Sequence, residues 1–151
     1  MTEPVLDGVP HISVPVPVRW SDFDANGHVN NAAYGTLLEE ARIQVFWYDD
    51  VPGVQADPAG WRMRELVIQA TGGPQEELST FVAKQTIEYL RPIDQARNPV
   101  TVELWVSRIG GAIVDVSYLM RDGETIYAKA ITSLVVVDRV TGEPRHVPRD
   151  L

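Results

Sequence analysis

Hydrophobic and polar residues alternate near the start of the chain. The apolar positions of this segment are Ile12, Val14, Val16 and Val18. A period of two is typical of a strand that buries one of its faces. The intervening Pro15 and Pro17 cannot donate a hydrogen bond to a neighbouring strand, so we expect them to face a sheet edge or a bulge.

The apolar spacing then changes to that of a helix. The apolar positions are Tyr34, Leu37, Leu38, Ala41, Val45 and Tyr48, and Ile43, Phe46 and Trp47 widen the same surface. This pattern predicts one helix of about 17 residues. Asn30 or Asn31 is its expected N-cap. The helix should end near Asp49, before Pro52 and Gly53. Because apolar residues occur on several sides of this helix, we expect other elements of the fold to surround it.

The remaining apolar segments are rich in β-branched and aromatic residues, which favour strands. They span residues 61–70, 80–90, 100–109, 112–121 and 125–137. Gly110-Gly111 and Asp122-Gly123 are signals for two-residue hairpins. The last three strands should therefore form an antiparallel meander.

The order of predicted elements is one strand, one long helix and five further strands, with no internal repeat and no dividing linker. This order predicts an α+β fold in which a curved antiparallel sheet of five to six strands wraps around one central helix. Residues 1–151 have the length of one ordinary domain, so we expect a single domain.

Composition narrows the chemistry. The chain has no cysteine, so thiolate metal sites, disulfides and a cysteine nucleophile are excluded. The net charge of −8 argues against a nucleic-acid partner. No apolar run approaches the roughly 20 residues that a membrane span needs, and the first ten residues, MTEPVLDGVP, do not resemble a secretion signal. These features predict a cytoplasmic protein without membrane or nucleic-acid partners.

The turn before the predicted helix, DFDANG at residues 22–27, resembles the first half of a calcium-binding loop. Its aspartates and asparagine occupy the first, third and fifth positions, and Gly27 occupies the sixth. The twelfth position should be a bidentate glutamate but is Ala33. Pro15 and Pro17 would also interrupt the helix that enters such a loop. We therefore expect no metal here.

The same turn carries a family resemblance. The stretch VRWSDFDANGHVNNAAYGTLLEEAR at residues 18–42, with TIEYLRP at residues 86–92, resembles the hotdog-fold thioesterases. The similar branch is that of 4-hydroxybenzoyl-CoA and long-chain acyl-CoA thioesterases. The resemblance implies a hotdog fold and hydrolysis of an acyl thioester of coenzyme A (CoA) or acyl carrier protein without a cofactor. It also implies a homodimer or homotetramer with its sites between subunits.

The resemblance further implies site residues. Asp24 matches the catalytic aspartate of the hydroxybenzoyl-CoA branch, and Asp24, Asn26 and His28 match the Asp-x-Asn-x-His set of plant acyl-carrier-protein thioesterases. Glu88 is a weaker counterpart of a glutamate assigned in those enzymes. Asn31 stands where the hydroxybenzoyl enzyme has an aromatic residue, so its aromatic substrate is not carried over.

Thioester hydrolysis explains why these residue types would be needed. The leaving thiol resembles cysteine, with a pKa near 8.5, and departs without much help from an acid. Asp24 can act as a general base or as a nucleophile through a mixed anhydride, and both alternatives stay open. The first N–H groups of a helix lack intrahelical acceptors, and we expect that of Asn31 to polarise the thioester carbonyl. His28 and Asn26 would orient the water or the carboxylate.

Substrate contacts are expected from Gly27, Tyr34 and Glu88. Candidates for lining an apolar acyl channel are Tyr34, Leu38, Phe46, Trp47 and Trp61. Two other functions remain as alternatives. One is a hotdog enoyl hydratase or dehydratase, although such enzymes space their Asp and His further apart than Asp24 and His28. The other is a module that binds acyl thioesters without hydrolysing them.

Overall fold

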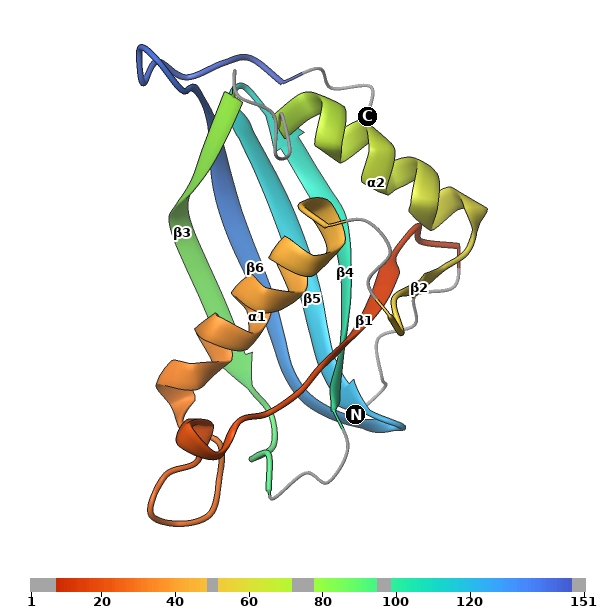
Figure 1. Ribbon diagram of the computed structural model, residues 1–151, viewed down its shortest axis with the longest axis vertical. Coiled ribbons are helices and arrows are strands. Elements are labelled where there is room, and N and C mark those ends of the chain that lie inside the picture. Colours follow the sequence, from red (N-terminus) through yellow and green to blue (C-terminus); the bar gives the residue numbers. More distant parts are fainter. Residues whose placement is uncertain (1–7, 49–51, 72–77, 95–98, 148–151) are drawn as a thin grey trace.

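The computed structural model describes residues 8–48, 52–71, 78–94 and 99–147 (Figure 1). Its elements in chain order are β1 (Ile12–Val16), a 3₁₀ turn (Trp20–Asp22), α1 (Asn31–Phe46), β2 (Gln55–Ala56), α2 (Pro58–Thr71), β3 (Leu78–Tyr89), β4 (Val100–Gly110), β5 (Ile113–Asp122) and β6 (Thr125–Asp138). In the described ranges, no helix is long and apolar enough to cross a membrane.

The six strands form one antiparallel sheet in the order β2-β1-β4-β5-β6-β3. Figure 1 shows α1 lying along one face of this curved sheet, with α2 beside the end of α1 near β4. The predicted α+β fold is confirmed. Along β1, only Ile12 and Ser13 pair with β2, so Pro15 lies where this strand has a neighbour on one side, as expected.

Burial follows the alternation of the strands. Along β6 the even-numbered residues from Ile126 to Val136 are buried and belong to the face that packs on α1, while the odd-numbered residues lie on the other face, the outer face. On α1 the buried residues are Tyr34, Leu37, Leu38, Ala41, Val45 and Phe46. Three members of the predicted apolar surface are not among them: Ile43 is half-buried, and Trp47 and Tyr48 lie beyond the helix and are exposed. Glu39 lies on the opposite, exposed side of α1.

The predicted strand at residues 61–70 is wrong, because these residues belong to helix α2. Asp57 begins the helix: its Oδ1 accepts the Gly60 N–H at 2.8 Å, and its backbone carbonyl accepts the Trp61 N–H at 3.0 Å. Pro58 takes the first helical position, where a missing N–H costs nothing. The Asp-Pro start signal was in the sequence and outweighs the strand preference of the residues that follow.

The packing of residues 61–70 agrees with a helix. Met63 and Val67, one turn apart, pack into the core, whereas Arg62 and Glu65 are exposed. Gly60 permits the close approach of α2 to the N-terminal strands, since a Cβ at this position would collide with the backbone oxygen of His11. The chain thus buries the apolar side of α2 at the β1 and β4 end of the sheet.

The predicted meander is confirmed, with each hairpin loop one residue later than expected. Gly110 pairs with Ile113, so the first loop is Gly111 and Ala112. Asp122 pairs with Thr125, so the second loop begins at Gly123. The two loop glycines have φ angles of 61° and 58°, in the left-handed region that glycine adopts without strain.

Candidate active site

The DANGH sequence between β1 and α1 folds into a closed loop at residues 24–28. The Asp24 N–H donates to the His28 carbonyl at 2.7 Å, and the Gly27 N–H donates to the Asp24 carbonyl at 3.1 Å. Gly27 has a φ of 78°, which explains the glycine at this position. The loop therefore brings the predicted Asp24, Asn26 and His28 together within one turn.

The Asp24 carboxylate serves the loop with only one of its oxygens. Oδ1 accepts the N–H groups of Asn26 at 2.9 Å and of His28 at 3.1 Å. For Oδ2 the described residues supply no hydrogen-bond donor, and the side chain is exposed. One oxygen thus fixes the orientation of the carboxylate, and the other is open to a ligand.

Asp22 has a structural role. Its side chain is only 3% exposed. Arg19 donates to it from the backbone at 2.8 Å and from the guanidinium at 2.9 Å. Burial raises the pKa of Asp22, but the hydrogen bonds from Arg19 outweigh burial and hold that pKa below its ordinary value. Arg19 occupies both carboxylate oxygens, so Asp22 does not act as the first ligand of a calcium loop.

Helix α1 starts directly after this loop, with Asn30 as its N-cap. The Asn30 side chain accepts the Ala32 N–H at 2.9 Å, and its carbonyl accepts the Ala33 N–H at 2.8 Å. For the Asn31 N–H, the described part of the chain supplies no acceptor. An unpaired donor therefore remains at the positive end of the helix, where it can bind a developing oxyanion.

A carboxylate from a distant segment approaches the loop. His28 Nε2 lies 3.2 Å from Asp94 Oδ1. The Val29 N–H donates to the Ile93 carbonyl at 2.9 Å, which holds the two segments together. Sequence reasoning missed Asp94, because nothing in the spacing of the chain links it to His28.

Tyr34 and Tyr89 join the first turns of α1 to the end of β3. Their rings meet edge to face with centroids 4.8 Å apart. Burial raises the pKa of Tyr34. The Tyr89 hydroxyl donates to the Asn31 carbonyl at 3.2 Å. Tyr34 thus supports the site by packing against Tyr89, and its predicted contact with substrate stays a prediction.

Comparison with known proteins places this arrangement in a family. The model of the Thioesterase-like superfamily matches residues 18–151, which include the whole site. The chain belongs to this superfamily. No curated protein sequence matches the chain significantly.

Solved structures agree with the thioesterase family. The PA2801 protein of Pseudomonas aeruginosa, named as a thioesterase, is 26% identical, with a TM-score of 0.66 over 90% of this chain and 91% of that chain. A Thermus thermophilus thioesterase solved with coenzyme A and Zn is also 26% identical, with a TM-score of 0.62 over 91% of this chain and 85% of that chain. The DHNA-CoA thioesterase of Staphylococcus aureus, 15% identical with a TM-score of 0.67 over 90% and 80%, shares the fold. The protein is therefore a hotdog-fold thioester hydrolase.

Within this thioesterase fold, Glu88 does not join the loop. Tyr89 faces α1, so its neighbour Glu88 points to the outer face of the sheet. There it stands opposite Lys129 and lines, with Trp105 and Ile131, a cavity of about 300 Å³. The resemblance made Glu88 a weaker counterpart of an assigned glutamate, and strand alternation turns its side chain to the face of the sheet opposite Tyr89 and α1. Its expected contact with substrate stays a prediction.

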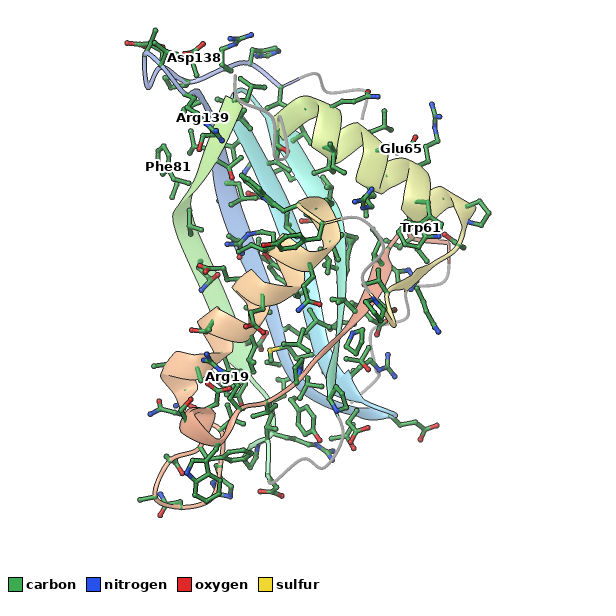
Figure 2. The ribbon with its side chains drawn as sticks, viewed as in Figure 1. Arg19, Trp61, Glu65, Phe81, Asp138 and Arg139 are labelled. Atoms are coloured by element: carbon green, nitrogen blue, oxygen red, sulfur yellow. The ribbon has the colours of Figure 1, made fainter. Side chains whose placement is uncertain are left out.

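The thioesterase has a larger cavity between the second half of α1 and the first half of β3. Its volume is about 600 Å³, and its lining includes Trp47, Phe81 and Arg42. Of the other expected channel residues, Tyr34, Leu38 and Phe46 lie in the core. Figure 2 shows Trp61 on α2, well apart from Arg19 and the start of α1.

Proposed function

We propose that the protein hydrolyses an acyl thioester of CoA or acyl carrier protein to a free acid and a thiol, with Asp24 as the reacting carboxylate. One observation carries this proposal. At the start of α1, the acceptor Asp24 Oδ2 and the donor Asn31 N–H both lack a partner among the described residues. The first can attack or deprotonate, and the second can stabilise the oxyanion.

Two reaction sequences use these groups. In the nucleophilic sequence, Asp24 Oδ2 attacks the thioester carbon, the carbon–sulfur bond breaks, and water then hydrolyses the mixed anhydride. In the general-base sequence, Asp24 takes a proton from water, the resulting hydroxide attacks the carbon, and the proton passes to the leaving thiolate. The Asn31 N–H donates to the carbonyl oxygen in both. Asn26 and His28 orient water beside Asp24, and Gly27 permits the acyl group to approach the loop.

Coenzyme A is the carrier that the comparisons favour, because the Thermus thermophilus neighbour was solved with coenzyme A. The net charge of −8 also disfavours an acidic carrier protein. Neither reaction sequence needs a cofactor. The cytoplasm, where acyl-CoA is available, is the location we propose.

The β3 edge supports a homodimer, or a homotetramer built from two dimers. β3 ends the sheet and has no strand partner beyond β6 among the described strands. Phe81 is 54% exposed there, Val82 and Tyr89 are also exposed, and Figure 2 shows Phe81 projecting away from the sheet. An apolar edge of this length is normally covered, and the edge of a second copy would cover it while enclosing the start of α1.

A mass measurement tests this assembly. We expect the native protein to have two or four times the chain mass of 16.8 kDa. Phe81→Lys should shift the protein towards monomer and lower thioesterase activity. Val140→Lys is the matched control, because Val140 is also apolar and exposed but lies outside the strands. A monomeric wild-type protein with full activity would overturn the assembly.

A two-signal assay tests the reaction class. The protein is incubated with acyl-CoAs of graded chain length, including an enoyl-CoA, while free thiol and enoyl absorbance are followed. We expect thiol release from the saturated acyl-CoAs. With the enoyl-CoA, any loss of enoyl absorbance should be matched by an equal release of thiol, because hydrolysis also removes the conjugated thioester. Asp24→Asn should abolish this thiol release. Enoyl loss without thiol release would instead identify a hydratase. Saturable binding with no turnover would identify a binding module.

A further inference from the structure

The contact between His28 and Asp94 is not explained by stability. The two side chains are 44% and 78% exposed. An exposed pair of this kind contributes only about 0–1 kcal/mol to folding. The position of the Asp94 carboxylate beside the loop therefore needs an explanation other than stability.

The backbone, and not the side-chain pair, brings Asp94 to this place. Ile93 is fully buried, and its carbonyl accepts the Val29 N–H at 2.9 Å. Just upstream, the N–H groups of Leu90 and Arg91 both donate to the Tyr127 carbonyl of β6, at 2.8 and 3.1 Å. The segment before Asp94 is thus fastened to the loop on one side and to the sheet on the other.

His28 is consequently held at two points by two carboxylates. Its backbone N–H donates to Asp24 Oδ1, and its ring nitrogen Nε2 faces Asp94 Oδ1. A neutral imidazole that donates from Nε2 keeps Nδ1 as an acceptor. The ring would then be ready to accept a hydrogen bond from the water that attacks near Asp24.

We propose that Asp94 is a positioning residue of the thioesterase site, which fixes the ring orientation of His28 through Nε2. This inference rests on the proposed function in one respect, namely that His28 orients the reacting water. The geometric part, that Asp94 orders the His28 ring, can be measured independently of activity.

The test uses Asp94→Ala with Asp122→Ala as its matched control. Both carboxylates act on Tyr127, where they help burial to raise the pKa, and both side chains are exposed. Asp122 has no contact with His28 among the described interactions. We expect NMR relaxation of the His28 ring to show increased motion in Asp94→Ala and no change in Asp122→Ala.

Kinetics then test the role in the reaction. We expect Asp94→Ala to lower kcat about tenfold with little change in KM, as loss of an orienting partner does, and Asp94→Glu to recover most of that loss. In the His28→Gln background, Asp94→Ala should have no further effect, because a residue that acts through His28 loses its influence with it.

Two results would overturn the proposal: an unchanged His28 ring order in Asp94→Ala, or an undiminished tenfold loss in the His28→Gln background. If the wild-type protein hydrolyses no thioester, the proposed function fails, and the ring-order measurement still decides whether Asp94 positions His28.

Discussion

Two turns at opposite ends of the molecule share one construction. In the DANGH loop, Asp24 Oδ1 accepts two backbone N–H groups, and Gly27 closes the turn with a φ of 78°. After β6, Asp138 Oδ1 accepts the N–H groups of Val140 at 2.9 Å and Thr141 at 3.0 Å, and Gly142 closes the turn with a φ of 74°. Figure 2 shows Asp138 at the end of the molecule opposite Arg19, which precedes the DANGH loop.

The two turns differ in what happens to the second carboxylate oxygen. Asp138 Oδ2 is 3.2 Å from the Arg145 guanidinium. The backbone hydrogen bonds from Thr141 and Val140, helped by Arg145, hold the pKa of Asp138 below its ordinary value. For Asp24 Oδ2, by contrast, the described residues provide no cation and no donor. Of the two turns, only that of Asp24 leads directly into a helix N-terminus.

This difference separates turn chemistry from site chemistry. An aspartate followed by a glycine is sufficient to make either turn. A reacting carboxylate additionally needs an oxygen without a partner and a nearby donor for the oxyanion. We therefore expect the same substitution to have different effects in the two turns. Depending on the turn, it should affect activity, stability or neither.

The largest expected effect is on catalysis by Asp24. Asparagine can still accept both backbone N–H groups through Oδ1, so Asp24→Asn should keep the loop and lose the charge. We expect kcat for thiol release to fall by about 10²–10⁴. Asp138→Asn makes the same change in the other turn and should leave kcat unchanged. Equal activity of the two variants, both folded by circular dichroism, would remove Asp24 from the mechanism.

Next in size is the stability that buried Asp22 contributes. Asp22→Asn should lower the free energy of unfolding by about 2–3 kcal/mol, because it weakens charge-assisted bonds to Arg19. The folded pKa of Asp22 lies below the ordinary value of 3.8. Its contribution is therefore complete above that value and is lost as the pH falls through the lower folded pKa.

Denaturant unfolding of both proteins at about pH 7 and about pH 3 measures this dependence. The difference between wild type and Asp22→Asn should shrink at the lower pH. A constant difference would mean that charge at Asp22 is not what stabilises the fold.

A smaller effect is expected from the two glycines. A Cβ added at either position would have no other atom within 4 Å, so alanine would meet backbone strain alone. Gly27→Ala and Gly142→Ala should each cost about 1–2 kcal/mol in unfolding experiments. Only Gly27→Ala should also reduce kcat, by at least about tenfold, because it displaces Asp24. If both variants kept full activity, the detailed shape of the DANGH loop would not matter for the reaction.

The smallest effect is expected from Arg145. Its ion pair with Asp138 is exposed, and such pairs contribute little to stability. Arg145→Ala should leave the Tm within experimental error and kcat unchanged. A clear fall in Tm would show that the second turn depends on its cation more than its backbone bonds indicate.

Periodicity predicted most of the fold because it records which side of each element is buried. Strand β1, helix α1 and the four strands from β3 to β6 lie where the sequence pattern placed them. The error at residues 61–70 has a local cause, since a helix of mixed composition carried its evidence in Asp57 and Pro58 and not in its apolar spacing. β2 has only two residues and therefore no period to detect.

The site residues also divide into those that the sequence predicts and those that only the folded chain shows. Asp24, Asn26, Gly27, His28 and the cap at Asn30 could be read from the sequence, because the hydrogen bonds that close their loop and cap the helix connect residues at most four apart. The approach of Asp94 to His28, the contact of Tyr89 with Asn31 and the outward direction of Glu88 required the folded chain. These contacts depend on which strands pair and in which register, and long-range pairing leaves no spacing pattern along the chain.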